Sequence, residues 1–276
     1  MATQGKRRAF GQHFLKDRVL CDRIADRAFE LLNEHQCIRM LEVGPGAGAI
    51  TDPLLERLEK NVAPALTEFL LVERDRDLAA RWKAEARPKL RVECADMVRI
   101  EENLWLEPSP LGVVSNLPYS AGTAIVERLA RQWRHIPFML LMFQAEVGQR
   151  LRAEPDTRAW GSLSVWTQNL WDVEKFATVP PGAFAPPPEV MSEVVLLRRR
   201  SEPRIPGTEA SPEARAQWES LVRISFAHRR KMLRSGLPKS GPWLAALAKS
   251  EIDPTRRAET LDWDDWKRFF EALLSS

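Results

Sequence analysis

The sequence predicts an α/β fold with a doubly wound parallel sheet, followed by a small α-helical domain. Two observations carry this prediction. From about residue 19 to residue 197, helical patterns alternate with short, nearly continuous apolar runs, which are typical of strands buried on both faces of a parallel sheet. Beyond residue 197 the sequence becomes rich in proline, glycine and serine and then shows helical patterns alone. We therefore expect one domain at residues 1–198 and a second at residues 199–276.

The expected elements of the first domain follow in order. A helix should begin after Asp17, because apolar residues then recur at helical spacing. Buried strands are expected at residues 40–43, 69–72, 90–92, 111–114 and 138–143. Helices should lie between some of these strands, at residues 75–86 and 121–133. Two last runs, at residues 173–179 and 190–197, flank a proline-dense turn and predict a terminal antiparallel hairpin.

The second domain is expected to begin with a linker. Residues 198–214 contain almost no apolar side chains and several prolines and serines, a composition typical of linkers. Helices are then predicted at residues 218–226, 243–247 and 263–274. Three tryptophans before this point lie on differing faces of a helix, which favours packing over a stacking platform: Trp160, Trp166 and Trp171.

Composition and charge narrow the class of protein. With 44% apolar and 29% charged residues and a mean hydropathy of −0.33, the chain is expected to be a soluble globular protein. It has no apolar window long enough to span a membrane, and no apolar segment follows the basic N-terminus as a secretory signal requires. The three widely spaced cysteines form neither a disulfide framework nor a CxxC zinc site. We expect a cytoplasmic protein without a metal site.

The net charge of +3 is distributed unevenly along the chain. Residues 1–18 carry an excess of +4, residues 19–196 of −6, and residues 197–276 of +5. Basic ends around an acidic centre suggest a polyanionic partner held by the ends, with a ligand site between them. Ordinary solvated surface charge would produce the same numbers, so this alternative stays open.

The strongest motif is the glycine loop LEVGPGAG at residues 41–48. Its GxGxG spacing differs from the dinucleotide pattern, and no Lys-Ser/Thr pair follows, which excludes a Walker P-loop. Glu42 stands two residues before the first glycine and suits a ligand with positive charge rather than a pyrophosphate. Glu73 ends the second strand, where a carboxylate can accept both ribose hydroxyls, and Asp96 is placed to meet an adenine edge. Together these residues predict an S-adenosylmethionine site on a class I (Rossmann-like) methyltransferase sheet; a plain tight turn is the alternative.

A second motif, Asn116-Leu117-Pro118-Tyr119, directly follows the fourth strand. This is the carboxyl edge of the sheet, where open α/β folds bind ligands. A planar base can stack on Tyr119, while its exocyclic amine reaches the Asn116 side-chain oxygen and the Pro118 carbonyl. Taken alone, the motif is also compatible with an Asn-Pro turn and a packed aromatic ring.

With these motifs, nearly the whole chain resembles the KsgA/RsmA-type ribosomal RNA adenine dimethyltransferases. The further segments that carry the resemblance are GQHFL at 11–15, VPP at 179–181, FAPPPEVMS at 184–192, FAHRRKMLR at 226–234 and residues 253–261. The last two distinguish the chain from the related antibiotic-resistance methylases that act on large-subunit RNA. His13 stands where bacterial members usually carry Asn.

The resemblance implies the site residues and the reaction. The cofactor site would contain His13, Leu15, Gly44, Glu73, Asp96 and Asn116. The target-base site would contain Asn116, Leu117, Pro118, Tyr119 and Phe184, the last on a turn that carries an aromatic ring towards the base. The RNA would be held by Arg229, Arg230, Lys231 and Arg234. Such an enzyme, expected as a monomer, would dimethylate N6 of two adjacent adenines in the 3′-terminal hairpin of small-subunit (16S) ribosomal RNA during ribosome biogenesis, on the immature small subunit.

Two other classes of protein stay open. A DNA adenine N6-methyltransferase could share the glycine loop and the Asn-Pro-aromatic motif. A non-catalytic ribosome-assembly or transcription factor could retain the fold and use its basic ends to bind nucleic acid. The intact glycine loop and the intact residues 116–119 argue against the second class.

Overall fold

The computed structural model describes residues 13–275, which form two compact units. The first comprises the chain up to Gly148 together with Val173–Arg199, and the second comprises Gln149–Asp172 together with the chain from Arg200 onward. The second junction falls between Arg199 and Arg200, one residue after the boundary expected at 198/199. The segment Gln149–Asp172 groups with the C-terminal helices because its helix α7 (Ser162–Leu170) packs against α8 (Pro212–Ala227). Gly11 and Gln12 of the first segment of the family resemblance, and Lys6, Arg7 and Arg8 of the basic N-terminal end, lie outside the described residues.

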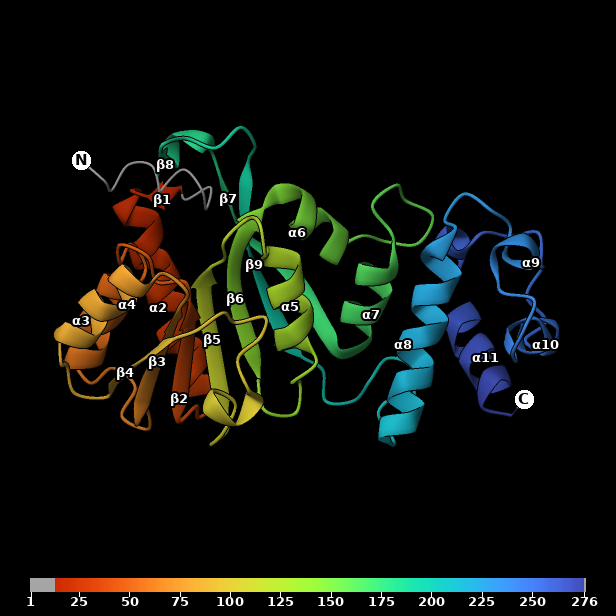
Figure 1. The fold of residues 1–276 in the computed structure, drawn as a ribbon, viewed down its shortest axis with the longest axis horizontal. Helices are drawn as coiled ribbons and strands as arrows, with labels where there is room; N and C mark the ends of the chain where they lie inside the picture. Colours follow the sequence, from red (N-terminus) through yellow and green to blue (C-terminus); the bar gives the residue numbers. More distant parts are fainter. Residues whose placement is uncertain (1–12, 276) are drawn as a thin grey trace. The chain divides into compact units, whose positions relative to one another are not determined.

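A seven-stranded sheet of order β4-β3-β2-β5-β6-β9-β7 forms the first unit (Figure 1). Its parallel strands are β2 (Arg39–Val43), β3 (Glu68–Glu73), β4 (Leu90–Cys94), β5 (Leu111–Asn116) and β6 (Phe138–Gln144). The last strand, β9 (Ser192–Arg199), pairs antiparallel with β6 and lies between it and β7 (Trp171–Val179). Every expected strand is present, and β7 and β9 are neighbours at one edge, as a terminal hairpin requires.

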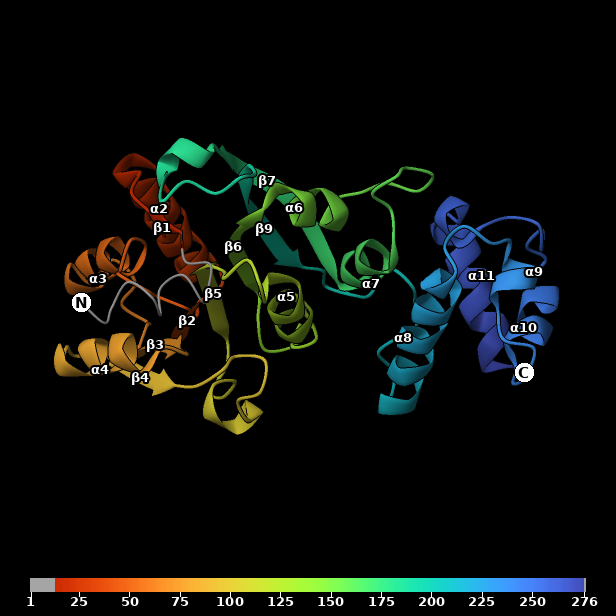
Figure 2. The ribbon, with the colours of Figure 1, turned by 45° about the horizontal axis from the view of Figure 1, so that its top comes forward.

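The apolar strands are buried because helices cover the sheet. Every residue of β2 is buried, as are all residues of β6 except Gln144, which is typical of a parallel sheet covered on both faces. Figure 2 shows α2 (Arg18–Glu34) and α5 (Gly122–Ala130) on opposite faces. The edge strand β4 is only half-buried, contrary to expectation. There Arg91 forms ion pairs with Glu68 and Glu93 (3.6 and 2.9 Å), and charged edges of this kind discourage further strand pairing.

Two helices of the first unit begin at the caps that the sequence indicates. Asp17 caps α2, its side chain accepting a hydrogen bond from the Leu20 amide at 3.0 Å. Asp75 caps α4 (Arg76–Ala84) in the same way. These caps satisfy amide groups that have no partner within the helix. The remaining helices of this unit are α3 (Thr51–Glu59) and the start of α6 (Ala145–Leu151).

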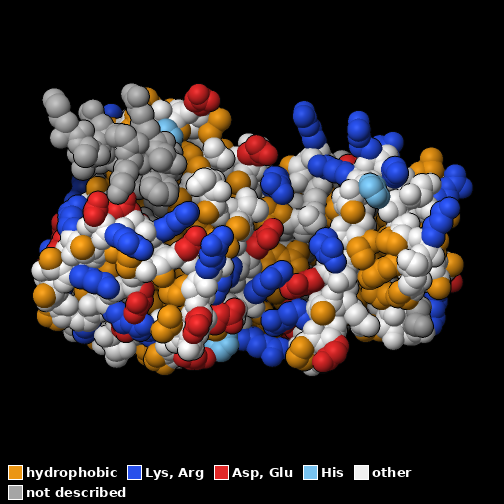
Figure 3. All heavy atoms as spheres, in the orientation of Figure 1, with side chains coloured by type: hydrophobic (Ala, Val, Ile, Leu, Met, Phe, Trp, Pro, Cys, Tyr) orange, Lys and Arg blue, Asp and Glu red, His pale blue; other side chains and the backbone are white. Residues whose placement is uncertain are grey.

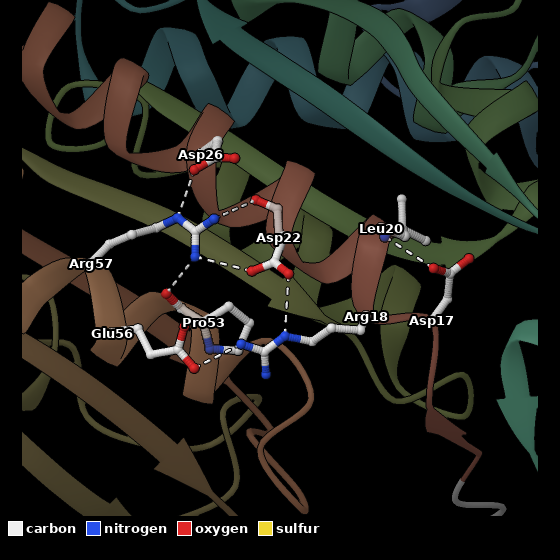
Figure 4. Close-up of polar contacts among 8 residues, drawn as sticks. All are labelled: Asp17, Arg18, Leu20, Asp22, Asp26, Pro53, Glu56 and Arg57. Carbon is white, nitrogen blue, oxygen red and sulfur yellow. Dashed lines mark hydrogen bonds and ion pairs between the residues drawn. The ribbon is translucent and has the colours of Figure 1, made fainter.

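An ion-pair network joins α3 to α2 (Figure 4). The Arg57 guanidinium donates to Asp26 at 2.7 Å and to Asp22 at 3.2 Å. Arg18 contacts Asp22 at 3.2 Å and Glu56 at 2.7 Å. Because α3 directly follows the glycine loop, this network helps to fix the loop's far end relative to the helical layer.

The second unit is helical, as expected. Besides α7 and α8 it contains α9 (Leu233–Gly236), α10 (Trp243–Lys249) and α11 (Trp263–Leu274). Its core is built on aromatic pairs, among them Trp218 and Trp266 in edge-to-face contact at 6.1 Å. Trp160, Trp166 and Trp171 are buried, which agrees with a packing role. Within residues 13–275 no helix has the length and apolar character needed to cross a membrane.

The expected linker is instead packed structure. Ile205 and Thr208 are buried, and one buried side chain, that of Asn169, holds the segment. Its Oδ1 accepts from the Ile205 amide at 2.8 Å, and its Nδ2 donates to Thr208 Oγ1 at 2.9 Å. Composition missed this because a buried asparagine can satisfy an irregular backbone without a run of apolar residues.

Candidate functional site

One pocket opens at the carboxyl ends of β2, β3 and β5, the edge at which open α/β sheets bind ligands. It encloses about 1170 Å³ including its open mouth, enough for a ligand larger than a single nucleobase. Its wall includes every residue expected to hold the cofactor and the whole second motif: His13, Leu15, Gly44, Glu73, Asp96, Asn116, Leu117, Pro118 and Tyr119. Side chains from five separate stretches of sequence therefore meet in one cavity.

The glycine loop is shaped by a tryptophan that the sequence analysis did not single out. Trp82 on α4 is fully buried and donates from Nε1 to the Gly46 carbonyl at 3.0 Å. Its ring also lies where a Cβ atom on Gly48 would stand, at 2.9 Å, and Gly48 has a φ of +103°. Any side chain at Gly48 would therefore meet both a clash and backbone strain. In the sequence, only the apolar face of α4 indicates that Trp82 is buried.

Glu73 is held in a fixed orientation at the end of β3. Its Oε2 accepts from the Gly46 amide at 3.0 Å, and its Oε1 accepts from the Asp75 amide at 2.8 Å. Each carboxylate oxygen retains a second acceptor position. The group can therefore accept two further hydrogen bonds, as a ribose diol would supply, without losing its anchoring.

Asp96 stands just beyond β4 on the same side of the pocket. Its Oδ1 accepts from the Val98 amide at 2.9 Å, and its Oδ2 lies 3.8 Å from Arg74 Nε. The first bond fixes the carboxylate while leaving acceptor capacity at both oxygens. An exocyclic amine in the pocket can donate to it.

Glu42 brings a buried carboxyl group to the same wall. It is 2% exposed, and its Oε2 has no hydrogen-bond partner among the described residues. Burial raises the pKa of Glu42 to about 8; the Thr51 hydroxyl opposes this shift, and the nearby carboxylates of Asp52 and Glu73 add to it. A cation bound beside Glu42 would favour the ionised form and supply the missing partner.

The second motif presents an acceptor that also lacks a partner. Asn116 ends β5, and its Oδ1 is buried without a hydrogen bond among residues 13–275. The Leu117 amide donates to the Met142 carbonyl at 2.9 Å, which holds this turn against β6. The Pro118 carbonyl accepts from the Ala121 amide at 3.0 Å and retains one lone pair. The turn therefore offers two oxygens to a donor in the pocket.

Tyr119 is held by contacts from three sides. Its hydroxyl lies 2.5 Å from Oγ of Ser192, a buried residue at the start of β9. The His13 ring stacks on it at 5.6 Å with an interplanar angle of 29°, and His13 Nδ1 lies 2.8 Å from the Pro186 carbonyl. Phe184 meets the ring edge-on at 6.4 Å. Ser192 lies in the segment 184–192 that carries the family resemblance, but no local pattern gave it this contact.

Phe184 has a different place from the other expected site residues. It is 1% exposed and does not line the pocket. It belongs to β8 (Phe184–Ala185), which pairs antiparallel with β1 (Phe14–Leu15). This small sheet brings His13 and Leu15 to the pocket, so in this structure Phe184 supports the site from behind Tyr119 and does not face a ligand.

The four basic residues expected to hold RNA lie in the second unit and differ among themselves. Arg230, Lys231 and Arg234 are exposed. Arg229 is half-buried and donates from Nε to Glu259 at 2.7 Å and from Nη2 to the Arg158 carbonyl at 2.6 Å. Its guanidinium is therefore already engaged within the protein.

The pocket fits S-adenosylmethionine. The oriented Glu73 suits its ribose hydroxyls, and Asp96 suits its adenine amine. The unpartnered oxygen of Glu42 suits its positive charge, and the glycine loop lets the backbone approach closely.

Comparisons with known proteins agree with this chemistry. The family model described as ribosomal RNA adenine dimethylase matches residues 3–274. A protein from Syntrophotalea carbinolica named ribosomal RNA small subunit methyltransferase A is 36% identical to this chain. The match covers 97% of this chain and 96% of that protein. The Bordetella petrii protein of that name is also 36% identical, covering 100% and 98%.

Solved structures confirm the fold. The chain is similar to the 23S rRNA methyltransferase ErmE, with a TM-score of 0.65 and 27% identity over 94% of this chain and 99% of that one. A dimethyladenosine transferase from Plasmodium falciparum gives a TM-score of 0.71 at 21% identity, over 93% and 96%, and this likeness concerns the fold alone. The chain belongs to the ribosomal RNA adenine dimethylase family, and it is an S-adenosylmethionine-dependent rRNA methyltransferase.

Proposed function

We propose that this enzyme transfers two methyl groups to N6 of each of two adjacent adenines in the 3′-terminal hairpin of small-subunit ribosomal RNA. The observation that carries the proposal is the buried, unpartnered Oδ1 of Asn116, which lines the same pocket as the cofactor-binding residues. A buried acceptor without a partner costs about 1–3 kcal/mol. An adenine amine is a donor of the kind that would satisfy it.

In this proposal the cofactor is held by groups that are already oriented. Glu73 binds the ribose hydroxyls, Asp96 binds the adenine amine, and Glu42 faces the positive charge. The Gly44 backbone lies beside the ligand, while His13 and Leu15 cover it from the small β1–β8 sheet. When bound, S-adenosylmethionine supplies an activated methyl group on a sulfonium.

The chain's contribution to methyl transfer is to orient the acceptor amine. The adenine N6 lone pair is conjugated with the ring, so the nitrogen is a poor nucleophile. The Asn116 Oδ1 and the Pro118 carbonyl would accept hydrogen bonds from the amine and favour its more tetrahedral form, which can attack. Positioning and preorganised acceptors of this kind lower the barrier without a general base.

Tyr119 is proposed as a stacking surface and not as a proton acceptor. Burial raises the pKa of Tyr119 above its ordinary value, which keeps the phenol protonated at neutral pH; the Ser192 hydroxyl opposes this shift. The bond to Ser192 and the edge contact with Phe184 fix the ring's orientation. A rigid ring can stack with the target base, and such a stack contributes about 1–3 kcal/mol.

The small-subunit RNA is proposed from the names of the relatives. Proteins similar to this chain over nearly its whole length are named small-subunit rRNA methyltransferases. The substrate is proposed to be the immature small subunit, since its RNA must still be accessible. A monomer is proposed because a single chain is sufficient to bring together the residues expected to hold the cofactor.

The test is methyl transfer mapped to the nucleotide. Immature small subunits, large-subunit RNA and duplex DNA are offered with labelled S-adenosylmethionine, and modified adenines are located by primer extension. We expect label on two adjacent adenines near the 3′ end of small-subunit RNA. Label in large-subunit RNA or in DNA instead would contradict the proposed substrate. RNA binding without methyl transfer would favour a non-catalytic assembly factor.

A further inference from the structure

Arg229 lies at a junction of three segments in the second unit. Its Nε donates to Glu259 Oε2 at 2.7 Å, and its Nη2 donates to the carbonyls of Arg158 and Thr157 at 2.6 and 3.4 Å. The Glu259 carbonyl in turn accepts from the Asp156 amide at 2.8 Å. The Arg229–Glu259 pair therefore connects the loop before α7, the turn after α8 and the segment before α11.

Backbone hydrogen bonds hold the latter two segments together as well. The Leu233 amide donates to the Arg256 carbonyl at 2.8 Å, and the Arg234 amide donates to the Pro254 carbonyl at 3.0 Å. The loop at residues 154–160 is attached differently. It is joined to the other two segments by hydrogen bonds to Arg229 and Glu259, and its last residue, Trp160, also contacts Trp263 at the start of α11 edge-on at 5.7 Å.

Free cations project from these segments. Arg158, Arg230 and Lys231 are exposed, and their side chains have no hydrogen bond or ion pair within the described part of the chain. In Figure 3, Lys and Arg side chains gather on the surface of the second unit. Unpaired cations close together at a surface are what an RNA backbone requires.

We propose that Arg158 contacts RNA phosphates together with Arg230 and Lys231, and that Arg229, oriented by Glu259, is a positioning residue that holds Arg158 in this surface by its hydrogen bond to the Arg158 carbonyl. The proposal rests on the proposed RNA-binding function and specifies which residues form the RNA surface of the second unit. It differs from the sequence-based expectation in two ways. Arg158 joins the phosphate-binding set, and Arg229 leaves it.

The role of Glu259 makes this proposal separable from simple charge attraction. Replacing Glu259 by Gln removes a negative charge from a basic surface, so charge alone predicts tighter RNA binding. If the carboxylate positions the loop, the same substitution releases Arg158 and weakens binding. The two accounts therefore predict opposite signs.

The experiment measures the affinity of the full chain for a fluorescent transcript of the 3′ domain of small-subunit RNA, between 50 and 200 mM KCl. Arg158→Gln, Arg230→Gln and Glu259→Gln should each reduce the slope of log affinity against log salt by about 0.7–0.9, the value of one phosphate contact. At 0.15 M salt this corresponds to roughly four- to fivefold weaker binding. The Glu259→Gln, Arg158→Gln double variant should bind no more weakly than either single variant, because both remove one contact.

Two matched controls separate positioning from charge and from stability. Arg229→Lys keeps the charge but not the forked geometry, and it should weaken binding as Glu259→Gln does, whereas Arg230→Lys should not. Glu271→Gln removes an exposed acid on α11 and should not weaken binding. Faster amide hydrogen exchange at Asp156 in Glu259→Gln, with an unchanged unfolding temperature, would locate the effect in the loop.

Tighter RNA binding by Glu259→Gln, or an unchanged salt slope for Arg158→Gln, would overturn this inference. If the wild type still methylated the RNA, the proposed function would stand. A wild-type chain that neither binds nor methylates the RNA would overturn both.

Discussion

Replacement of Glu42 by Gln should stabilise the free protein above pH 4.5 and weaken cofactor binding. Glu42 is buried in the pocket wall with Oε2 unpartnered, and burial raises its pKa to about 8. At neutral pH the carboxyl of the free protein is therefore mostly protonated. Glutamine has nearly the same shape as the protonated acid, so the variant should fold normally.

The pKa of Glu42 determines the sign and the upper limit of the change in the free energy of unfolding. The folded-state pKa is raised, so the contribution of Glu42 to stability is fully present below pH 4.5 and is lost as the pH rises through 8. At about 1.4 kcal/mol for each pH unit across this interval, the loss is at most about 5 kcal/mol. Without cofactor, Glu42→Gln should therefore match the wild type near pH 4.5 and become progressively more stable than it towards pH 8.5.

Cofactor binding should respond in the opposite direction. A positive ligand beside Glu42 favours the ionised carboxylate, so wild-type binding near pH 7 should release close to one more proton than binding by Glu42→Gln. At pH 8 the wild type should bind the cofactor more tightly than Glu42→Gln does. The ratio of the two affinities should fall by at most tenfold for each pH unit below pH 8. Urea unfolding without cofactor and calorimetry in two buffers measure these quantities. A stability difference independent of pH, or equal proton release, would show that Glu42 does not change its ionisation and does not face the positive charge.

The remaining predictions concern the other walls of the pocket. Glu73→Ala should weaken S-adenosylmethionine binding at least roughly tenfold, because two charge-assisted hydrogen bonds are lost; unchanged affinity by calorimetry in a folded variant would mean the ribose lies elsewhere. Tyr119→Phe should remain substantially active and Tyr119→Ala should be severely impaired in single-turnover methyl transfer, whereas equal losses would favour a proton-acceptor role. Asn116→Ala should lower the single-turnover rate more than RNA affinity. Cofactor affinity is measured in parallel, and a near-normal rate would remove the proposed target-base site. Trp82→Phe should weaken cofactor binding several-fold through loss of the bond to the Gly46 carbonyl, about 0.5–1.5 kcal/mol, and a cofactor affinity equal to that of the wild type would show that the loop holds its shape without it.

Sequence patterns were sufficient for the sheet and for the chemistry at its edge. Parallel strands buried on both faces are apolar throughout, so β2 and β6 stand out from the helices around them. The carboxyl ends of such strands meet at one edge, and this rule alone brings Glu42, Glu73 and Asn116 together from widely separated positions. The structure confirms that all three line one pocket.

Contacts between distant side chains left no comparable signal. Trp82 shapes the glycine loop from the next helix, Ser192 orients Tyr119 across 73 positions, and Asn169 packs a segment that resembles a linker. Arg229 belongs to a basic run typical of an RNA contact, yet its partner, Glu259, lies 30 residues away. A periodic pattern reports which face of an element is buried, but not which polar group a side chain meets after folding.

The polar groups of the pocket divide into two kinds, and the division has a thermodynamic consequence. Glu73 and Asp96 are anchored by backbone amides before any ligand arrives, so binding costs little reorganisation there. Glu42 Oε2 and Asn116 Oδ1 are buried without partners, and each such group costs the folded protein about 1–3 kcal/mol. This energy is recovered only when a ligand supplies the missing donor. In the proposed function the cofactor satisfies Glu42 and the target amine satisfies Asn116, so both ligands would be needed before the pocket reaches its full stability. Because each recovery is independent of the other, the full recovery is expected only in the complex that holds both the cofactor and the base, which is the state that methyl transfer requires.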